Sequence, residues 1–92
     1  MRIDRLLCCL RFVKTRSQAQ RWIDAGHIRC NGVRVIRHSL PIAVDDILVL
    51  PVGADIRVAK ILVLPNRRGS PAVAQSQYRL LDQQGDNAIA NR

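Results

Sequence analysis

The side chains best suited to chemistry in this chain are three cysteines and two histidines, so metal binding and nucleophilic catalysis are tested first. Cys8, Cys9, Cys30 and His27 are metal ligands by type, but none of them stands in a C-x₂-C or H-x₃-H spacing. Adjacent cysteines on a helix also point in different directions, which makes Cys8 and Cys9 a poor pair of ligands. The sequence therefore predicts no metal site.

Catalysis has no stronger support. His27 and His38 lack a recognisable nucleophile and an orienting carboxylate, and the pair Asp45-Asp46 is typical of a turn. Neither a P-loop nor a G-x-G-x-x-G run occurs in the chain. A chain of 92 residues has room for one small domain, so we expect no enzyme cleft, no catalytic residues and no cofactor.

Basic side chains are the remaining feature that can bind a ligand. The chain has 15 Lys and Arg against 7 Asp and Glu, and residues 1–38 hold nine of these cations against only Asp4 and Asp24. Eight of the nine are arginine, whose planar fork suits phosphate. Charge gathered in one segment of a folded domain is typical of a protein that binds a polyanion.

Structured RNA is the polyanion that fits best. Only Phe12, Trp22 and Tyr78 are aromatic, so a platform for stacking single-stranded bases is poorly supplied, and DNA binding is only a weak option. A surface of anionic lipid is a weaker alternative, and no run approaches the roughly 20 apolar residues of a spanning helix. An odd number of cysteines, two of them adjacent, favours a reducing compartment and hence the cytoplasm.

The basic residues must be positioned by local structure, and the clearest signals lie within residues 14–34. Thr15 and Gln18 have the spacing of a capping box, which predicts a helix that begins near Arg16. The apolar face of this helix is formed by Ala19, Trp22 and Ile23, and the helix is expected to end at Gly26.

A hairpin follows the helix. Asn31-Gly32 predicts a two-residue type I′ turn, because both central residues of that turn need a positive φ. The turn places Arg29 opposite Arg34, and like charges directly opposite are destabilising. Two interpretations stay open: the two side chains splay into water, or they form an anion site.

The other elements complete an α+β fold. Apolar residues at helical spacing predict a first helix over residues 3–13, which packs against the second helix. Strands are expected at residues 47–50 and 56–64, and broken alternation in the second suggests a bulge or two-sided burial near Lys60. We expect two packed N-terminal helices against a small twisted antiparallel sheet.

The chain divides near Pro65. Residues 1–64 form the expected RNA-binding domain, and residues 65–92 form a basic turn and a weakly structured C-terminal tail. Residues 72–84 have room for a short helix with a weak apolar stripe, and residues 85–92 look disordered.

Residues 1–64 also resemble a known family. The run RIDRLLCCLRFVKTRSQAQRWIDAGHIRCNGVRV, followed by VDDILVL, resembles the small RNA-binding domain first described in ribosomal small-subunit protein four. The opening RIDRLL, the run LRFVKTRSQAQ and the closing LPNRRGSP are similar to the ribosome-associated heat-shock protein fifteen family. The order and spacing that carry the resemblance are those of Ala19, Ile23, Gly26, Ile28, Asn31, Gly32, Asp46 and Ile47.

The resemblance implies an RNA surface along the helix pair and the hairpin. Arg5 and Arg16 would flank the helix junction, and Ser17 with nearby amides would meet phosphate. The implied RNA-binding residues are Arg2, Arg5, Lys14, Arg16, Ser17, Arg21, Arg29 and Arg34.

The resemblance further implies a partner. Members of the heat-shock family are implied to dock on ribosomal RNA of the large subunit and to help recycle stalled subunits that carry a nascent chain on tRNA. We expect such a stress-response protein to be a cytoplasmic monomer without a membrane partner. The alternative is an RNA-binding accessory module for an RNA-modifying enzyme, because the domain also resembles an appendage of pseudouridine synthases. The tail here is less basic than is common in the family, so the sequence supports the nascent-chain role less strongly than it supports RNA binding.

Overall fold

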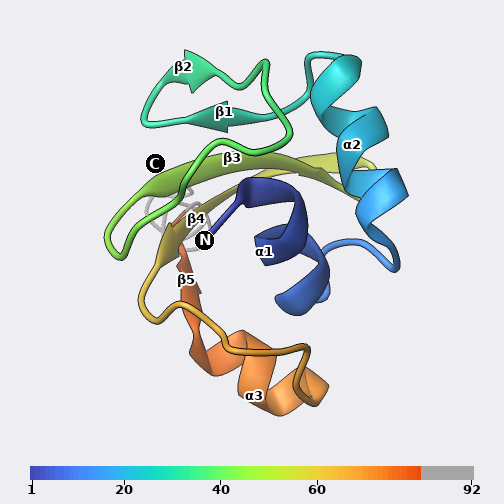
Figure 1. The fold of residues 1–92 in the computed structure, drawn as a ribbon. Coiled ribbons are helices and arrows are strands. Elements are labelled where there is room, and N and C mark those ends of the chain that lie inside the picture. The colour runs from blue at the N-terminus through green and yellow to red at the C-terminus, as the bar shows by residue number, and fades with distance from the viewer. Residues whose placement is uncertain (82–92) are drawn as a thin grey trace.

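The computed structural model describes residues 1–81 and places two helices, a five-stranded sheet and a third short helix (Figure 1). The elements in chain order are α1 (Ile3–Cys9), α2 (Arg16–Asp24), β1 (Arg29–Cys30), β2 (Val33–Arg34), β3 (Ile47–Val52), β4 (Asp55–Ile61), α3 (Pro71–Ser76) and β5 (Tyr78–Leu80). All neighbouring strands pair antiparallel in the order β2-β1-β3-β4-β5. The predicted α+β architecture, with two N-terminal helices against a small antiparallel sheet, is confirmed.

The core lies between α1 and the curved sheet. Figure 1 shows α1 on the inner side of the sheet, α2 beside it at one end and α3 below. The apolar stripe of α1 is fully buried, and α2 and the two long strands complete the same cluster. Its largest members are Ile3, Leu6, Leu7, Leu10, Ile23, Ile28, Leu48, Leu50 and Ile61. Burying each such side chain contributes on the order of 1.5–3 kcal/mol, so this layer holds α1 and α2 in place.

Helix α1 is shorter than the sequence predicts. It ends at Cys9, and Arg11 takes a left-handed φ of 66°. The amide of Arg11 donates to Cys8 O (3.1 Å) and the amide of Phe12 donates to Leu7 O (3.0 Å), which is the Schellman pattern of a helix end. The prediction of a helix through residue 13 was wrong. The helix ends earlier at a left-handed residue that is an arginine, and the sequence therefore lacked the glycine that usually marks such an end.

Helix α2 follows its sequence signals closely. The hydroxyl of Thr15 accepts from the amide of Gln18 (3.2 Å), so the helix begins at Arg16 as predicted. Gly26 has a φ of 81° and closes the helix with a second Schellman motif, in which the amide of His27 donates to Trp22 O (3.0 Å).

The predicted hairpin is confirmed. Asn31 and Gly32 have φ values of 53° and 84°, and Arg29 pairs with Arg34 across the two strands. The Asn31 amide group also bridges to the next strand, because its Nδ2 donates to Asp46 Oδ1 (3.1 Å) and its Oδ1 accepts from Ile47 N (3.0 Å). One side chain therefore fixes both the turn and the position of β1 beside β3.

The second half of the sheet differs from the prediction in two places. Strand β4 ends at Ile61 and not at residue 64. Its register with β3 is unbroken and it is partly buried on both faces, so of the two alternatives near Lys60 two-sided burial holds and a bulge does not. The expected helix over residues 72–84 is present only as α3 and was wrong for residues 78–80, which form β5 against β4. Tyr78 stacks on Phe12 with ring centroids 4.7 Å apart, a tertiary contact that no local pattern encodes. The expectation for residues 85–92 lies outside the described residues.

Candidate nucleic-acid interface

A buried carboxylate lies where α1 and α2 cross. Asp4 is fully buried, and Arg2 donates to both of its oxygens, from Nε to Oδ1 (2.7 Å) and from Nη2 to Oδ2 (2.9 Å). Two side chains one turn apart on α2 reach the same carboxylate: Gln20 Nε2 donates to Oδ2 at 3.0 Å and Arg16 Nη2 at 3.4 Å. Asp4 therefore fixes one arginine from each side of the helix junction.

The charge of Asp4 is held by these partners. Burial by itself raises the pKa of the carboxyl group, but the hydrogen bonds from Arg2 and Gln20 and the charge of Arg16 outweigh it and lower the pKa from 3.8 to about 2. The Arg2 and Arg16 side chains remain 43% and 48% exposed. Each guanidinium thus has one edge on Asp4 and another edge free for an anion from solvent.

The start of α2 adds backbone donors beside this pair. The hydroxyl of Thr15 satisfies the amide of Gln18, and the Gln18 Oε1 accepts from the amide of Lys14 (3.1 Å). Among residues 1–81 no acceptor faces the amides of Arg16 and Ser17. Free amides at the positive end of a nine-residue helix are suited to a phosphate, and Lys14 stands exposed next to them.

The remaining predicted residues lie at increasing distance along the two elements. Arg5 is exposed on α1 and donates from Nη2 to Asn66 O (2.9 Å), and Arg21 is exposed in the last turn of α2. The structure thus brings Arg2 and Arg16 together on Asp4, with Lys14 and Ser17 next to Arg16 at the start of α2, whereas Arg5 and Arg21 make no contact with this pair in the described residues.

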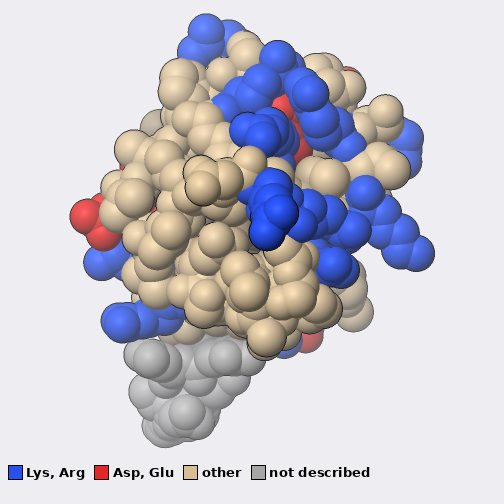
Figure 2. All heavy atoms as spheres, turned by 60° about the horizontal axis from the view of Figure 1, so that its bottom comes forward, with Lys and Arg blue, Asp and Glu red and all other residues tan. Residues whose placement is uncertain are grey.

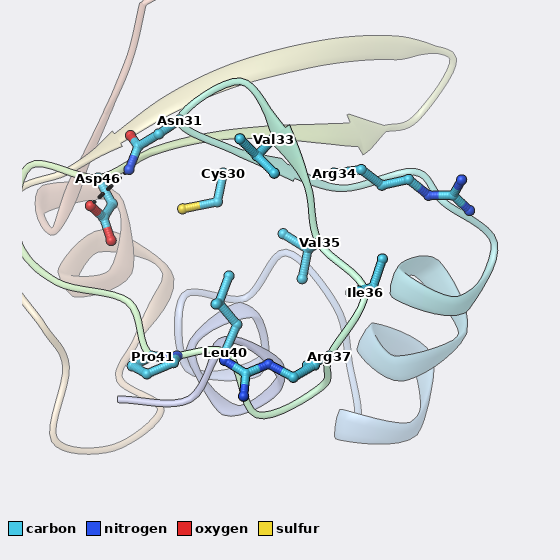
Figure 3. Close-up of a pocket in the computed structure, with 10 residues that line it drawn as sticks. All are labelled: Cys30, Asn31, Val33, Arg34, Val35, Ile36, Arg37, Leu40, Pro41 and Asp46. Carbon is cyan, nitrogen blue, oxygen red and sulfur yellow. Dashed lines mark hydrogen bonds between the residues drawn. The ribbon is translucent and has the colours of Figure 1, made fainter.

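The two hairpin arginines do not converge. Arg29 Nη1 donates to Gly32 O (3.4 Å) at the turn, whereas the Arg34 guanidinium lies over Gly26, where a Cβ would come within 2.5 Å of Arg34 Nη2. Figure 3 shows Arg34 extending away from the hairpin toward α2. The geometry favours the splayed interpretation over an anion site between the two, and it places the charge of Arg34 at the C-terminal end of α2, where the helix dipole is negative.

The basic side chains are not spread evenly. In Figure 2, most of the blue Lys and Arg side chains gather over the upper and right-hand parts of one face, while the middle of the same face is largely uncharged and a few charged side chains stand at its left edge. An uneven distribution of this kind attracts a polyanion to one side of the molecule.

A hollow of about 510 Å³ lies between the hairpin and the loop of residues 36–41 (Figure 3). Its lining is mostly apolar and includes the exposed side chains Val33 and Ile36. None of the residues that contact Asp4 lines it. The hollow is therefore separate from the side chains that surround Asp4, although Arg34 of the hairpin lines it.

The thiols are poorly suited to nucleophilic chemistry. Burial raises the pKa of the Cys9 and Cys30 thiols, whereas a reactive cysteine needs a lowered pKa. Within residues 1–81, no three His, Cys, Asp or Glu side chains come close enough to hold a metal ion. No helix in this part of the chain has the length and apolar character needed to cross a membrane.

Two residues of the interface were missed by the sequence analysis. Asp4 and Gln20 contact the arginines, yet the sequence marked Asp4 only as one of two acidic residues among nine basic ones in residues 1–38, and it gave Gln20 no role. The usable signal was that Arg16 and Gln20 stand four residues apart, which places them on one face of α2.

A family comparison agrees with this geometry. The model of the S4 domain family matches residues 1–48, which is more than half of the chain. The chain belongs to the S4 domain family. S4 domains are RNA-binding and not catalytic, so RNA binding is confirmed as the general function.

One solved structure extends the likeness beyond the S4 domain. The chain is similar to Heat Shock Protein 15 of Vibrio cholerae, described as a trimeric structure, with a TM-score of 0.87 and 27% sequence identity. The match covers 99% of this chain and 91% of that one. No curated protein sequence matches the chain. The resemblance to the heat-shock protein fifteen family is thereby confirmed, and it includes the strands and α3 that follow the S4 domain.

Proposed function

We propose that this protein docks on ribosomal RNA of the large ribosomal subunit and holds its phosphates with Arg2, Arg16 and the first turn of α2. The observation that carries the proposal is the arginine pair braced by buried Asp4. Both guanidinium groups are oriented from inside the fold and half exposed, so little side-chain entropy is lost when a phosphate binds.

Recognition in this proposal depends on phosphate and shape. Phe12 and Tyr78 pack against each other with their ring planes tilted by 45°, and Trp22 packs against the core, so the three rings are partly buried and do not form a shared platform for stacking bases. An A-form helix or a folded loop offers closely spaced phosphates to a strip of cations without base contacts. Lys14, Ser17, Arg21, Arg29 and Arg34 extend the proposed strip along α2 and the hairpin.

The likeness to Heat Shock Protein 15 supports a finer proposal about the role. We propose that the protein acts in the cytoplasm on stalled large subunits that carry tRNA and a nascent chain, as part of a stress response. The oligomeric state stays a prediction: the sequence favours a monomer, whereas the Vibrio cholerae protein is described as trimeric. Light scattering at several concentrations of the purified chain separates the two states.

Sedimentation of a cell lysate through a sucrose gradient at near-physiological salt tests the docking proposal. We expect the protein to travel with free large subunits, and Arg16→Gln to shift toward the top of the gradient, because one phosphate contact is lost. Arg79→Ala removes an equal charge from β5 and serves as the matched control.

A different partner would be visible in the same experiment. Protein that stays at the top of the gradient even at low salt would contradict docking on the ribosome. Copurification with an RNA-modifying enzyme would then favour the accessory-module alternative, and flotation with anionic liposomes would favour a lipid surface.

A further inference from the structure

A second group of arginines lies between α1 and the segment of residues 66–69, and it makes no contact with Asp4 in the described residues. The segment of residues 66–69 folds back against α1 and is held there by three arginine hydrogen bonds. Arg5 Nη2 donates to Asn66 O (2.9 Å), Arg11 Nε donates to Gly69 O (2.7 Å), and Arg68 Nε donates to Cys8 O (3.1 Å). These contacts join residues 58 to 61 positions apart, and Arg67 lies exposed in the same segment.

The backbone at Arg11 is held in a conformation that an arginine rarely adopts. Its φ of 66° costs of order 1–3 kcal/mol for a residue other than glycine. The side chain of Arg11 is exposed and projects from this turn onto Gly69. Glycine would adopt this φ at the helix end without backbone strain. Any advantage of an arginine at this position therefore comes from the contacts of its side chain.

The internal hydrogen bonds orient these arginines without consuming them. Arg11 and Arg68 are exposed and each uses only Nε, so the terminal Nη1 and Nη2 groups of both have no hydrogen-bond partner among residues 1–81. Arg67 has no hydrogen-bond partner among residues 1–81. A guanidinium fixed through Nε with its fork free is suited to two parallel hydrogen bonds with a phosphate.

No carboxylate neutralises this group within residues 1–81. No salt bridge joins a carboxylate of residues 1–81 to Arg5, Arg11, Arg67 or Arg68. The described carboxylates are engaged elsewhere: Asp4 with Arg2 and Arg16, Asp24 with His38, Asp45 with Lys60, Asp46 with Asn31, and Asp55 with Arg57. Four cations that gather without a counter-charge repel one another, and an external anion relieves that repulsion.

We propose that Arg5, Arg11, Arg67 and Arg68 form a second phosphate-binding site, which takes the backbone of the same structured RNA. The inference rests on the proposed function. Arg5 lies on the N-terminal side of this group, on the helix that also carries Asp4, so the RNA would pass across α1 from the start of α2 to the segment of residues 66–69. The RNA-contacting surface would thus extend beyond residues 1–48, which the S4 family model matches.

Variants that spare the fold can test the second site. Arg67→Ala removes a side chain with no described partner, and Arg68→Gln removes a charge while its amide can still donate to Cys8 O. Arg79→Ala, on the far edge strand β5, is the matched control. The probe is purified large ribosomal subunits, with affinity measured across about 50 to 200 mM salt. Thermal unfolding of each variant is measured in parallel.

The expected result is a weaker and less salt-dependent complex. The double variant Arg67→Ala/Arg68→Gln should lower the slope of log affinity against log salt by about 2, one for each cation, and should bind roughly tenfold or more weakly. Arg79→Ala should match the wild type in both measurements. All three proteins should unfold at similar temperatures.

The outcomes separate this site from the proposed function. Wild-type slope and affinity in the double variant, together with weakened binding by Arg16→Gln, would overturn the second site alone. Failure of the wild type to bind the subunits at any salt would overturn the proposed function and this inference with it. Weakening by Arg79→Ala equal to that by the single variant Arg67→Ala would also overturn the second site, because each removes one charge and the effect would then follow net charge and not position.

Discussion

Replacing Asp4 by asparagine separates the charge of the buried carboxylate from its shape. The pKa of Asp4 is lowered from 3.8 to about 2 in the folded protein, so the ionised carboxylate is more stable in the folded than in the unfolded state. At 1.36 kcal/mol for each pKa unit, the ionised carboxylate contributes about 2 kcal/mol of stability at neutral pH. Arg2 and Arg16 are half exposed and can turn to water, so we expect Asp4→Asn to cost roughly that amount and not the larger penalty of a fully buried charge.

The pH dependence of this difference carries a definite sign. A group whose pKa is depressed by folding stabilises the protein above its unfolded pKa of 3.8, and the contribution is lost as the pH falls toward about 2. Urea unfolding of the wild type and of Asp4→Asn should therefore differ by about 2 kcal/mol near pH 7 and converge between about pH 5 and pH 2. The exposed Asp55→Asn, which makes the same change of charge, is the control and should show a small difference.

RNA binding by the same variant provides an independent check. Asp4→Asn raises the net charge by one, which by itself would strengthen binding to a polyanion. We expect weaker binding instead, because Arg2 and Arg16 lose the carboxylate that orients them. A free-energy difference that does not change with pH, or RNA affinity that rises with the added charge, would refute the assignment of Asp4 as the positioning residue.

Three further predictions concern the first site and the turns that support it. Lys14→Ala should lower the salt slope of RNA binding by about 1 without changing the unfolding temperature, and an unchanged slope would remove Lys14 from the strip. Gly26→Ala should destabilise the domain by about 1–2 kcal/mol in urea unfolding, because φ is 81° and the new Cβ meets the Arg34 guanidinium, and wild-type stability would show that Arg34 moves aside without strain at this position. Asn31→Ala should lower the free energy of unfolding by a similar amount, because it removes both hydrogen bonds to the β3 side and leaves an alanine at positive φ. Asn31→Gly should cost less, because glycine adopts a positive φ without strain, and equal losses in the two variants would show that backbone strain does not contribute.

Short-range backbone chemistry made much of the helix pair and hairpin predictable. The capping pair Thr15 and Gln18, the helix end at Gly26 and the Asn31-Gly32 turn each act within a few residues, so their residue types alone indicated the conformation. The same signal misled where the residue type was unusual. Arg11 occupies a left-handed position that normally takes glycine, and α1 was therefore predicted to be too long.

The sequence by itself determined the fold class, the asymmetry of charge and the basic residues that gather around the start of α2. The types and positions of these basic residues are read directly from the chain, and the S4 family model matches the segment that holds them. Only the tertiary structure decided what those residues do to one another. The burial of Asp4 between two helices, the pairing of β5 with β4 and the return of residues 66–69 to α1 join positions that are far apart in the chain. Such contacts depend on how packed elements meet, and no periodicity within one element records that meeting.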